Sequence, residues 1–182
     1  MYDMDKLNHS KYRIALIILI LNTLCLLFNQ HLDARQIPGL ELSVFFDKNE
    51  YKPGEAIYIN FKLKNTSNKP IYVNKRFFVN SESSEPEDKE VFLQITGPSG
   101  EKLPCKASYD TGFPKTDYFV LLEPKEEVTS ERKKNLKAYF DLKAPGEYSV
   151  IAIYQNIYGE EIGVDVFKDK ITSKPATIKI IE

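Results

Sequence analysis

Histidine is nearly absent from this 182-residue sequence, which contains two, His9 and His31. Both lie in or beside an N-terminal hydrophobic segment, and no histidine follows Ala34. Nucleophilic triads and zinc sites usually need imidazole, and no glycine-rich phosphate loop is present either. Paired carboxylates can hydrolyse glycosides, but nothing in the sequence singles out a pair from ordinary charged surface. We therefore predict a non-enzyme with no catalytic, cofactor-binding or metal-binding residues.

Cysteine is equally scarce. Cys25 lies inside the hydrophobic segment, so Cys105 is the one thiol in the remainder of the chain. An intramolecular disulfide is therefore excluded there, and thiol catalysis would lack an imidazole partner. We interpret Cys105 as a small, half-buried strand residue that packs near Leu103 and Pro104, with a disulfide to another molecule as the alternative.

The sequence also lacks an excess of charge of either sign. It has 25 Lys and Arg against 26 Asp and Glu, a net charge of -1, which gives no electrostatic reason to expect nucleic acid or an anionic membrane as a partner. Apolar residues make up 42%, enough for one domain with a core of its own. Tyr and Phe, 11 of each, suit strands.

One hydrophobic run stands out near the N-terminus. Residues Ile14 to Phe28 are almost entirely apolar, and Lys11 and Arg13 precede them. A membrane-spanning helix needs about 20 apolar residues and a signal-peptide core about 7 to 15, so the length favours a secretory signal over residues 1–34. Cleavage after Ala34 is expected. An uncleaved membrane anchor and a buried core helix are the alternatives. The protein should therefore be extracytoplasmic, periplasmic or secreted, or membrane-anchored by residues 14–28.

Single residues bear on the cleavage site and on a lipid anchor. Leu32, two residues before Ala34, is larger than the small residue usual at that position. A lipoprotein would need a small residue before Cys25 and an aliphatic one at position 22, whereas the chain has Leu24 and Asn22. We therefore do not expect a lipid on Cys25.

Residues 38–182 are expected to form one all-β domain. Short apolar segments alternate with turn signals from Leu40 onward, without helical periodicity. In the clearest strand, Ile57, Ile59, Phe61 and Leu63 point to one side, and Tyr58, Asn60, Lys62 and Lys64 point toward water. The expected strands are 40–46, 56–65, 71–73, 76–79, 91–95, 102–109, 118–122, 126–134, 149–154 and 176–181. Seven to nine antiparallel strands drawn from these ten segments predict an immunoglobulin-like β-sandwich, preceded by an N-terminal hydrophobic helix.

Several local expectations accompany this fold. The apolar segment 118–122 should be a central strand, the charged segment 126–134 an edge strand, and 136–140 a single helical turn. The polar and acidic segment 80–90 has no apolar anchors and should be a mobile loop. Its carboxylates could coordinate Ca²⁺, but their spacing matches no known Ca²⁺-binding loop, so we interpret it as solvated.

Turn chemistry adds three further expectations. Pro53-Gly54 predicts a type II turn. Tyr148 follows a Pro-Gly corner and either bonds back to the backbone or is an ordinary strand tyrosine. The tripeptide Asn65-Thr66-Ser67 is a glycosylation sequon, relevant in a eukaryote, and we interpret it as a plain turn.

A series of weak motifs then occurs in one order. They are Phe61-Lys-Leu-Lys-Asn65, Gly100-Glu-Lys-Leu-Pro104, Asp117-Tyr118, Leu122-Glu-Pro124, Leu136, Tyr139-Phe-Asp-Leu142 and Gly146-Glu-Tyr148. Over most of 40–155 the chain resembles the β-sandwich domain that precedes the catalytic domain in deuterolysin-like metalloendopeptidases, a domain that also occurs alone in bacterial proteins. Lys125 departs from that pattern, which usually has glycine after the proline. The protease domain is absent, since no His-Glu-x-x-His occurs, so no catalytic residue is carried over. A more distant similarity is to bacterial immunoglobulin-like proteinase inhibitors.

These observations predict an exported, non-enzymatic binding or interaction module. The expected partner is another protein, with no nucleic acid, and with the membrane involved through the N-terminal segment if it is uncleaved. The alternative is an inhibitor or regulator of a secreted protease, acting through a loop or an added strand.

Overall fold

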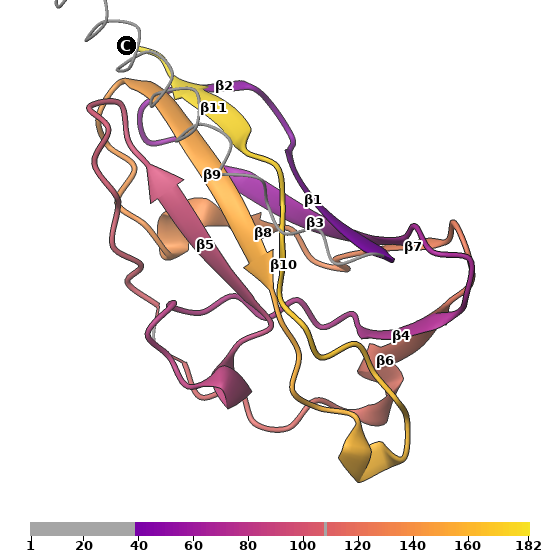
Figure 1. Cartoon of the computed structure of the whole chain (residues 1–182). Helices are drawn as coiled ribbons and strands as arrows, with labels where there is room; N and C mark the ends of the chain where they lie inside the picture. Colours follow the sequence, from indigo (N-terminus) through magenta and orange to yellow (C-terminus); the bar gives the residue numbers. More distant parts are fainter. Residues whose placement is uncertain (1–38, 108) are drawn as a thin grey trace, which may run out of the picture. The chain divides into compact units, whose positions relative to one another are not determined.

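The computed structural model describes residues 39–107 and 109–182 (Figure 1). The predicted leader, both histidines, Cys25 and the cleavage site after Ala34 lie outside the described residues. Across the part that is described, no helix has the length and apolar character required to cross a membrane.

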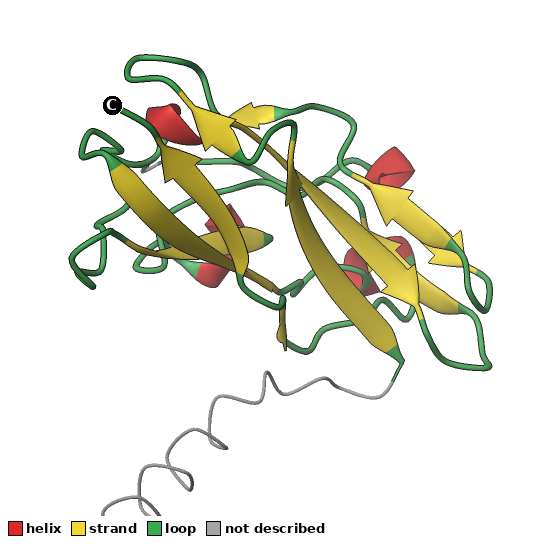
Figure 2. Ribbon diagram, turned by 90° about the horizontal axis from the view of Figure 1, so that it is seen from above, coloured by secondary structure: helices red, strands yellow, loops and turns green. Residues whose placement is uncertain are grey.

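The regular secondary structure of the described chain is mostly β-strand, as the sequence predicted (Figure 2). Its strands are β1 (Leu40–Phe46), β2 (Glu50–Tyr51), β3 (Tyr58–Asn65), β4 (Ile71–Asn74), β5 (Val91–Thr96), β6 (Phe119–Leu122), β7 (Glu127–Thr129), β8 (Lys134–Asn135), β9 (Gly146–Tyr154), β10 (Ile171–Thr172) and β11 (Ala176–Ile180). The helices are single 3₁₀ turns, η2 (Pro86–Asp88), η3 (Thr116–Tyr118), η4 (Leu136–Ala138) and η5 (Glu160–Ile162). The turn η4 confirms the helical turn predicted at 136–140.

Pairing between the named strands is antiparallel with one exception. One sheet has the order β1-β3-β7, with β8 also on β3, and a second has the order β10-β9-β11-β2, with β5 on β9. A third sheet contains β4 and β6, which lie away from the C-terminus in Figure 1. The two-residue strand β2 runs parallel to β11. Like β10, β2 was missed in the sequence, because two residues are too few to show a period.

Inward-facing side chains of both larger sheets belong to one apolar core. Ile57, Ile59, Phe61 and Leu63 are each 0% exposed, which confirms the period of two. Asn60 was expected in water and is buried instead. Its cross-strand partner on β1 is Phe45, whose side chain lies on that face of the sheet.

Two predicted strands are absent as strands. In segment 76–79 Phe77 has a φ of +49°, and the backbone N–H of Phe78 donates to the Glu90 carboxylate instead of to a neighbouring strand. In segment 102–109 one bridge forms, between Lys102 and Thr96. Pro104 has no N–H with which to extend that ladder.

Two other strands differ in position or length. Strand β6 was expected to be central, but in the described sheets it pairs with β4 and most of its residues are half-buried. The predicted edge strand 126–134 forms as two pieces, β7 and β8, both on β3. Between them Ser130 donates its N–H to Phe61 O and accepts from Phe61 N through Oγ.

The expected turns at Pro53 and Tyr148 are both present. Glu55 N donates to Lys52 O at 3.1 Å, and Gly54 has a φ of +82°, as a type II turn requires. The Tyr148 hydroxyl donates to Ala144 O at 2.7 Å, which resolves the two interpretations of Tyr148 in favour of the corner bond.

Asn65 forms the turn expected from its sequence. Its side chain is 0% exposed, Nδ2 donates to Lys69 O and Leu122 O, and Oδ1 accepts from Ser67 N and Oγ. Because both amide hydrogens are already donated inside the fold, the folded domain does not present this sequon to a glycan.

Lys125 occupies the position where the resembled family usually has glycine, and its φ is +73°. A side chain with a Cβ is strained at this φ, whereas glycine is not. Lys125→Gly should therefore raise the free energy of unfolding by about 0.5–1 kcal/mol. Lys125→Ala is the matched control, since it removes the charge and keeps the Cβ. Urea denaturation in which alanine stabilises as much as glycine would refute the strain argument.

Candidate functional site

A hollow of about 410 Å³ lies where three loops meet, after β4, before β6 and between β7 and β8. It is lined by Lys75, Arg76, Phe78, Thr111, Phe113, Lys115, Tyr118, Ser130, Glu131, Arg132 and Lys134, and we call it the basic pocket. Five of these side chains are cationic and one is a carboxylate.

Arg76, which lines the pocket, forms a buried ion pair with Glu90. Arg76 Nη2 lies 2.5 Å from Glu90 Oε1, and Nε donates to the same oxygen at 2.8 Å. The two side chains are 8% and 1% exposed. A buried pair needs good geometry and further hydrogen bonds to offset its desolvation cost.

Glu90 has those further bonds. Its second oxygen accepts from Phe78 N at 2.8 Å, and Asn74 Nδ2 donates to the first at 3.3 Å. Asn74 Nδ2 also donates to Asn156 Oδ1. The Tyr154 hydroxyl bonds the backbone of Asn74, donating to its O and accepting from its N. The ion pair is therefore joined by hydrogen bonds to β4 and to the end of β9.

The outer side of Arg76 holds the loop before β6. Its Nη1 donates to Thr111 O at 3.2 Å and to Gly112 O at 2.9 Å, and Nη2 donates to Thr111 Oγ1 at 3.1 Å. Asn80 adds a second clamp, with Nδ2 donating to Tyr109 O and Oδ1 accepting from Tyr109 N. One buried carboxylate thus orients an arginine, and that arginine fixes a surface loop.

The pocket carries more positive charge than its own residues neutralise. Lys75 pairs with Glu131 at 2.9 Å, and Arg76 is occupied by Glu90. In the described structure, Lys115, Arg132 and Lys134 form no ion pair. Burial and the nearby charge of Arg132 lower the pKa of the Lys134 ammonium, although the Glu90 carboxylate opposes this shift.

Aromatic side chains stand beside these cations. Phe113, on the loop held by Arg76, is 79% exposed and meets Tyr158 edge to face. Tyr109 is 48% exposed and packs edge to face on Phe78. Aromatic residues fixed in exposed positions next to cations are typical of the contact surfaces of binding proteins.

The sequence predicted no site here, and its interpretation of both partners was wrong. Arg76 was placed in a strand, and Glu90 at the end of a mobile loop. Glu90 and Asn80 are each 1% exposed, and Lys89 donates from Nζ to Glu82 O and Ser84 O, so both ends of segment 80–90 are fixed. An arginine and a glutamate 14 positions apart give no periodic signal, which is why the pair was missed.

Two other hollows lack this charge pattern. One lies on the Pro53-Gly54 turn, where Lys48 and Glu55 pair with each other. Another lies beside Tyr72 and is lined by Asp165, Lys168 and Asp169, so it contains charges of both signs. Within residues 39–107 and 109–182, no group of three or more His, Cys, Asp or Glu is placed to hold a metal ion.

Cys105 lies outside the basic pocket. It is half-buried and packs against the core with Leu103, and burial raises the pKa of its thiol. Such a thiol is a poor nucleophile at neutral pH. We expect Cys105→Ala to lower the free energy of unfolding by about 1 kcal/mol and to leave binding unchanged. A loss of binding with the fold intact would contradict the packing role.

No family model matches the chain, and a comparison with curated proteins finds no match either. The function is therefore inferred from the geometry of the described residues.

Proposed function

We propose that this protein is an exported, non-enzymatic interaction module that binds another protein through its basic pocket and the adjoining aromatic loop. The observation that carries the proposal is Phe113, a large apolar side chain that is 79% exposed on a loop clamped by Arg76. Exposing an aromatic ring to water brings the monomer no hydrophobic gain, whereas a fixed ring binds a partner at little cost in conformational entropy.

An immunoglobulin-like β-sandwich is the fold proposed for this module. Two sheets with a shared core and mainly antiparallel pairing support it, as does the corner bond from Tyr148 to Ala144. In such domains loops at one end of the sheets commonly carry the binding residues. The loops around Arg76 have that role in this proposal.

Export is proposed from the hydrophobic run at 14–28 and the cations that precede it. A reporter enzyme that works only outside the cytoplasm should be active when it is fused after Glu182. A fusion active in the cytoplasm and inactive outside it would refute both the cleaved and the anchored forms.

Binding is tested with the full-length protein as bait in an extract of its own source. Phe113→Ser should lose a partner that the unchanged protein retains, because it removes the exposed ring without disturbing the core. Phe45→Ser is the matched control, since Phe45 is 40% exposed on β1, away from the pocket lining. If the Phe113 variant retains every partner, or both variants lose the same one, the proposed surface is wrong. A retained protease that is inhibited by the protein would favour the protease-regulator function.

A further inference from the structure

We infer that the basic pocket recognises a short acidic segment of a partner protein, with a carboxylate seated among Lys115, Arg132 and Lys134 and an apolar residue against Phe113. This inference rests on the proposed function and adds the chemistry of the bound segment.

The first support is electrostatic. The three cations line one cavity and lack an ion pair within the described structure. At Lys134, burial and the charge of Arg132 lower the pKa of the ammonium, and the Glu90 carboxylate raises it. Like charges gathered in a partly enclosed cavity repel one another and concentrate positive potential there. A bound carboxylate relieves that repulsion and accepts hydrogen bonds from more than one donor at once.

The second support is that the two arginines of the pocket, Arg76 and Arg132, differ in their contacts. Arg76 is held by Glu90 and by the carbonyls of Thr111 and Gly112, so its guanidinium serves the structure. Arg132 is exposed and forms no ion pair with any described residue, which leaves its planar donors available for a carboxylate.

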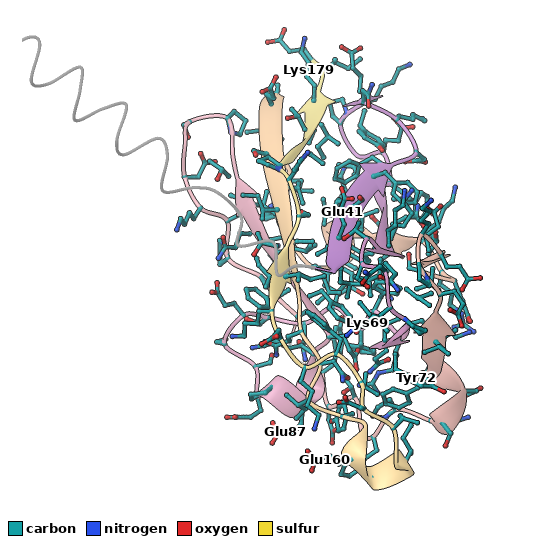
Figure 3. All side chains as sticks on the ribbon, turned by 45° about the vertical axis from the view of Figure 1, so that its right-hand side comes forward. Glu41, Lys69, Tyr72, Glu87, Glu160 and Lys179 are labelled. Atoms are coloured by element: carbon teal, nitrogen blue, oxygen red, sulfur yellow. The ribbon has the colours of Figure 1, made fainter. Side chains whose placement is uncertain are left out.

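The third support concerns size and surroundings. A hollow of about 410 Å³ accommodates one or two side chains and not a long polymer segment. The bordering segment is acidic, with Glu82, Glu85 and Glu87 exposed, and Glu87 O accepts from Thr111 Oγ1 on the pocket loop. Figure 3 shows Glu87 and Glu160 at the same end of the domain, opposite Lys179.

Those neighbouring carboxylates select against extended polyanions. A nucleic acid or a sulfated polysaccharide would leave the pocket and cross negative surface, whereas a local acidic side chain would not. The exposed ring of Phe113 beside the cations adds a place for an apolar neighbour of that acid.

The experiment measures binding of a blocked peptide, acetyl-Gly-Glu-Phe-Glu-Gly-amide, to the full-length protein by isothermal titration. A peptide with glutamine in place of glutamate is the ligand control. The protein variant combines Lys115→Gln, Arg132→Gln and Lys134→Gln. Its matched control combines Lys52→Gln, Lys102→Gln and Lys174→Gln, three exposed lysines that line no part of the pocket and change the net charge equally.

The pocket variant should bind the acidic peptide about tenfold more weakly, and the control variant within about twofold of the unchanged protein. Binding should also weaken several-fold when salt is raised from about 0.05 to 0.5 M. Equal losses in both variants, or equal binding of the glutamine peptide, would overturn the inference. So would tighter pocket-dependent binding of heparin, or a dimer in sedimentation that the pocket variant abolishes. If the peptide fails while Phe113→Ser still loses the partner, the acidic chemistry is wrong and the proposed function stands.

Discussion

Glu90→Ala should lower the free energy of unfolding by about 3–5 kcal/mol, the largest loss expected from any single change considered for this protein. The substitution leaves the Arg76 guanidinium buried without its counter-charge, and it leaves Phe78 N without an acceptor. Both costs arise because water cannot replace the lost partner at a site where Glu90 is 1% exposed. Urea denaturation followed by circular dichroism measures the change.

An exposed pair gives the matched control for Glu90. Glu131 pairs with Lys75 at 2.9 Å, and its side chain is 64% exposed, so Glu131→Ala should cost at most about 1 kcal/mol. A Glu90→Ala loss below about 1 kcal/mol, or equal losses for the two variants, would contradict the role given to the buried pair.

Replacing both partners separates charge from loop anchoring. Arg76→Met combined with Glu90→Leu should be less destabilising than Glu90→Ala, because no unpaired charge is left in the interior. The double variant still loses the bonds from Arg76 to Thr111 and Gly112. Limited proteolysis should therefore cut it between 109 and 118 faster than the unchanged protein, and equal rates of cleavage would contradict the anchoring role.

Asn65→Ala should cost about 2–4 kcal/mol. Its side-chain amide joins the turn after β3 to the end of β6, donating to Lys69 O at 2.7 Å and to Leu122 O at 2.8 Å. Alanine leaves both carbonyls and the Ser67 N–H without these partners. Asn65→Asp should be at least as costly, because its second oxygen would face two carbonyl oxygens in place of the donor.

Asn68 supplies the comparison for Asn65. It lies exposed in the same turn, so Asn68→Ala should change the free energy of unfolding by less than about 0.5 kcal/mol. Thermal unfolding in which both substitutions cost the same would show that turn propensity, and not the buried amide, stabilises this corner.

The sequence predicted well those features that depend on residues close together in the chain. The alternation at Ile57 to Leu63 records which face of β3 is buried, and Pro53-Gly54 and Tyr148 have conformational preferences that depend on near neighbours. Strand placement failed where distant side chains took the backbone donors, as Glu90 does with Phe78 N. The apolar character of β6 likewise could not reveal that it pairs with β4 outside the two larger sheets.

The candidate site could not be predicted for the same physical reason. Its cations come from separate segments after β4, before β6 and after β7, and the buried pair that joins the first two of these segments has no sequence period. The scarcity of histidine and cysteine directed attention to binding chemistry as a hypothesis. It contained no information on which surface would do the binding.

Site-specific photo-crosslinking in the native source tests directly whether a partner protein binds at Phe113 and the basic pocket. A photo-reactive phenylalanine analogue is placed at position 113 in one strain and at position 45 in another, with the full-length chain otherwise unchanged. We expect a discrete crosslinked protein from position 113 and none from position 45. The crosslink from position 113 should disappear when Lys115, Arg132 and Lys134 are also changed to glutamine. A crosslinked product from position 45 and none from position 113 would show that the partner binds the β1 edge of the sheet, and would contradict the claim.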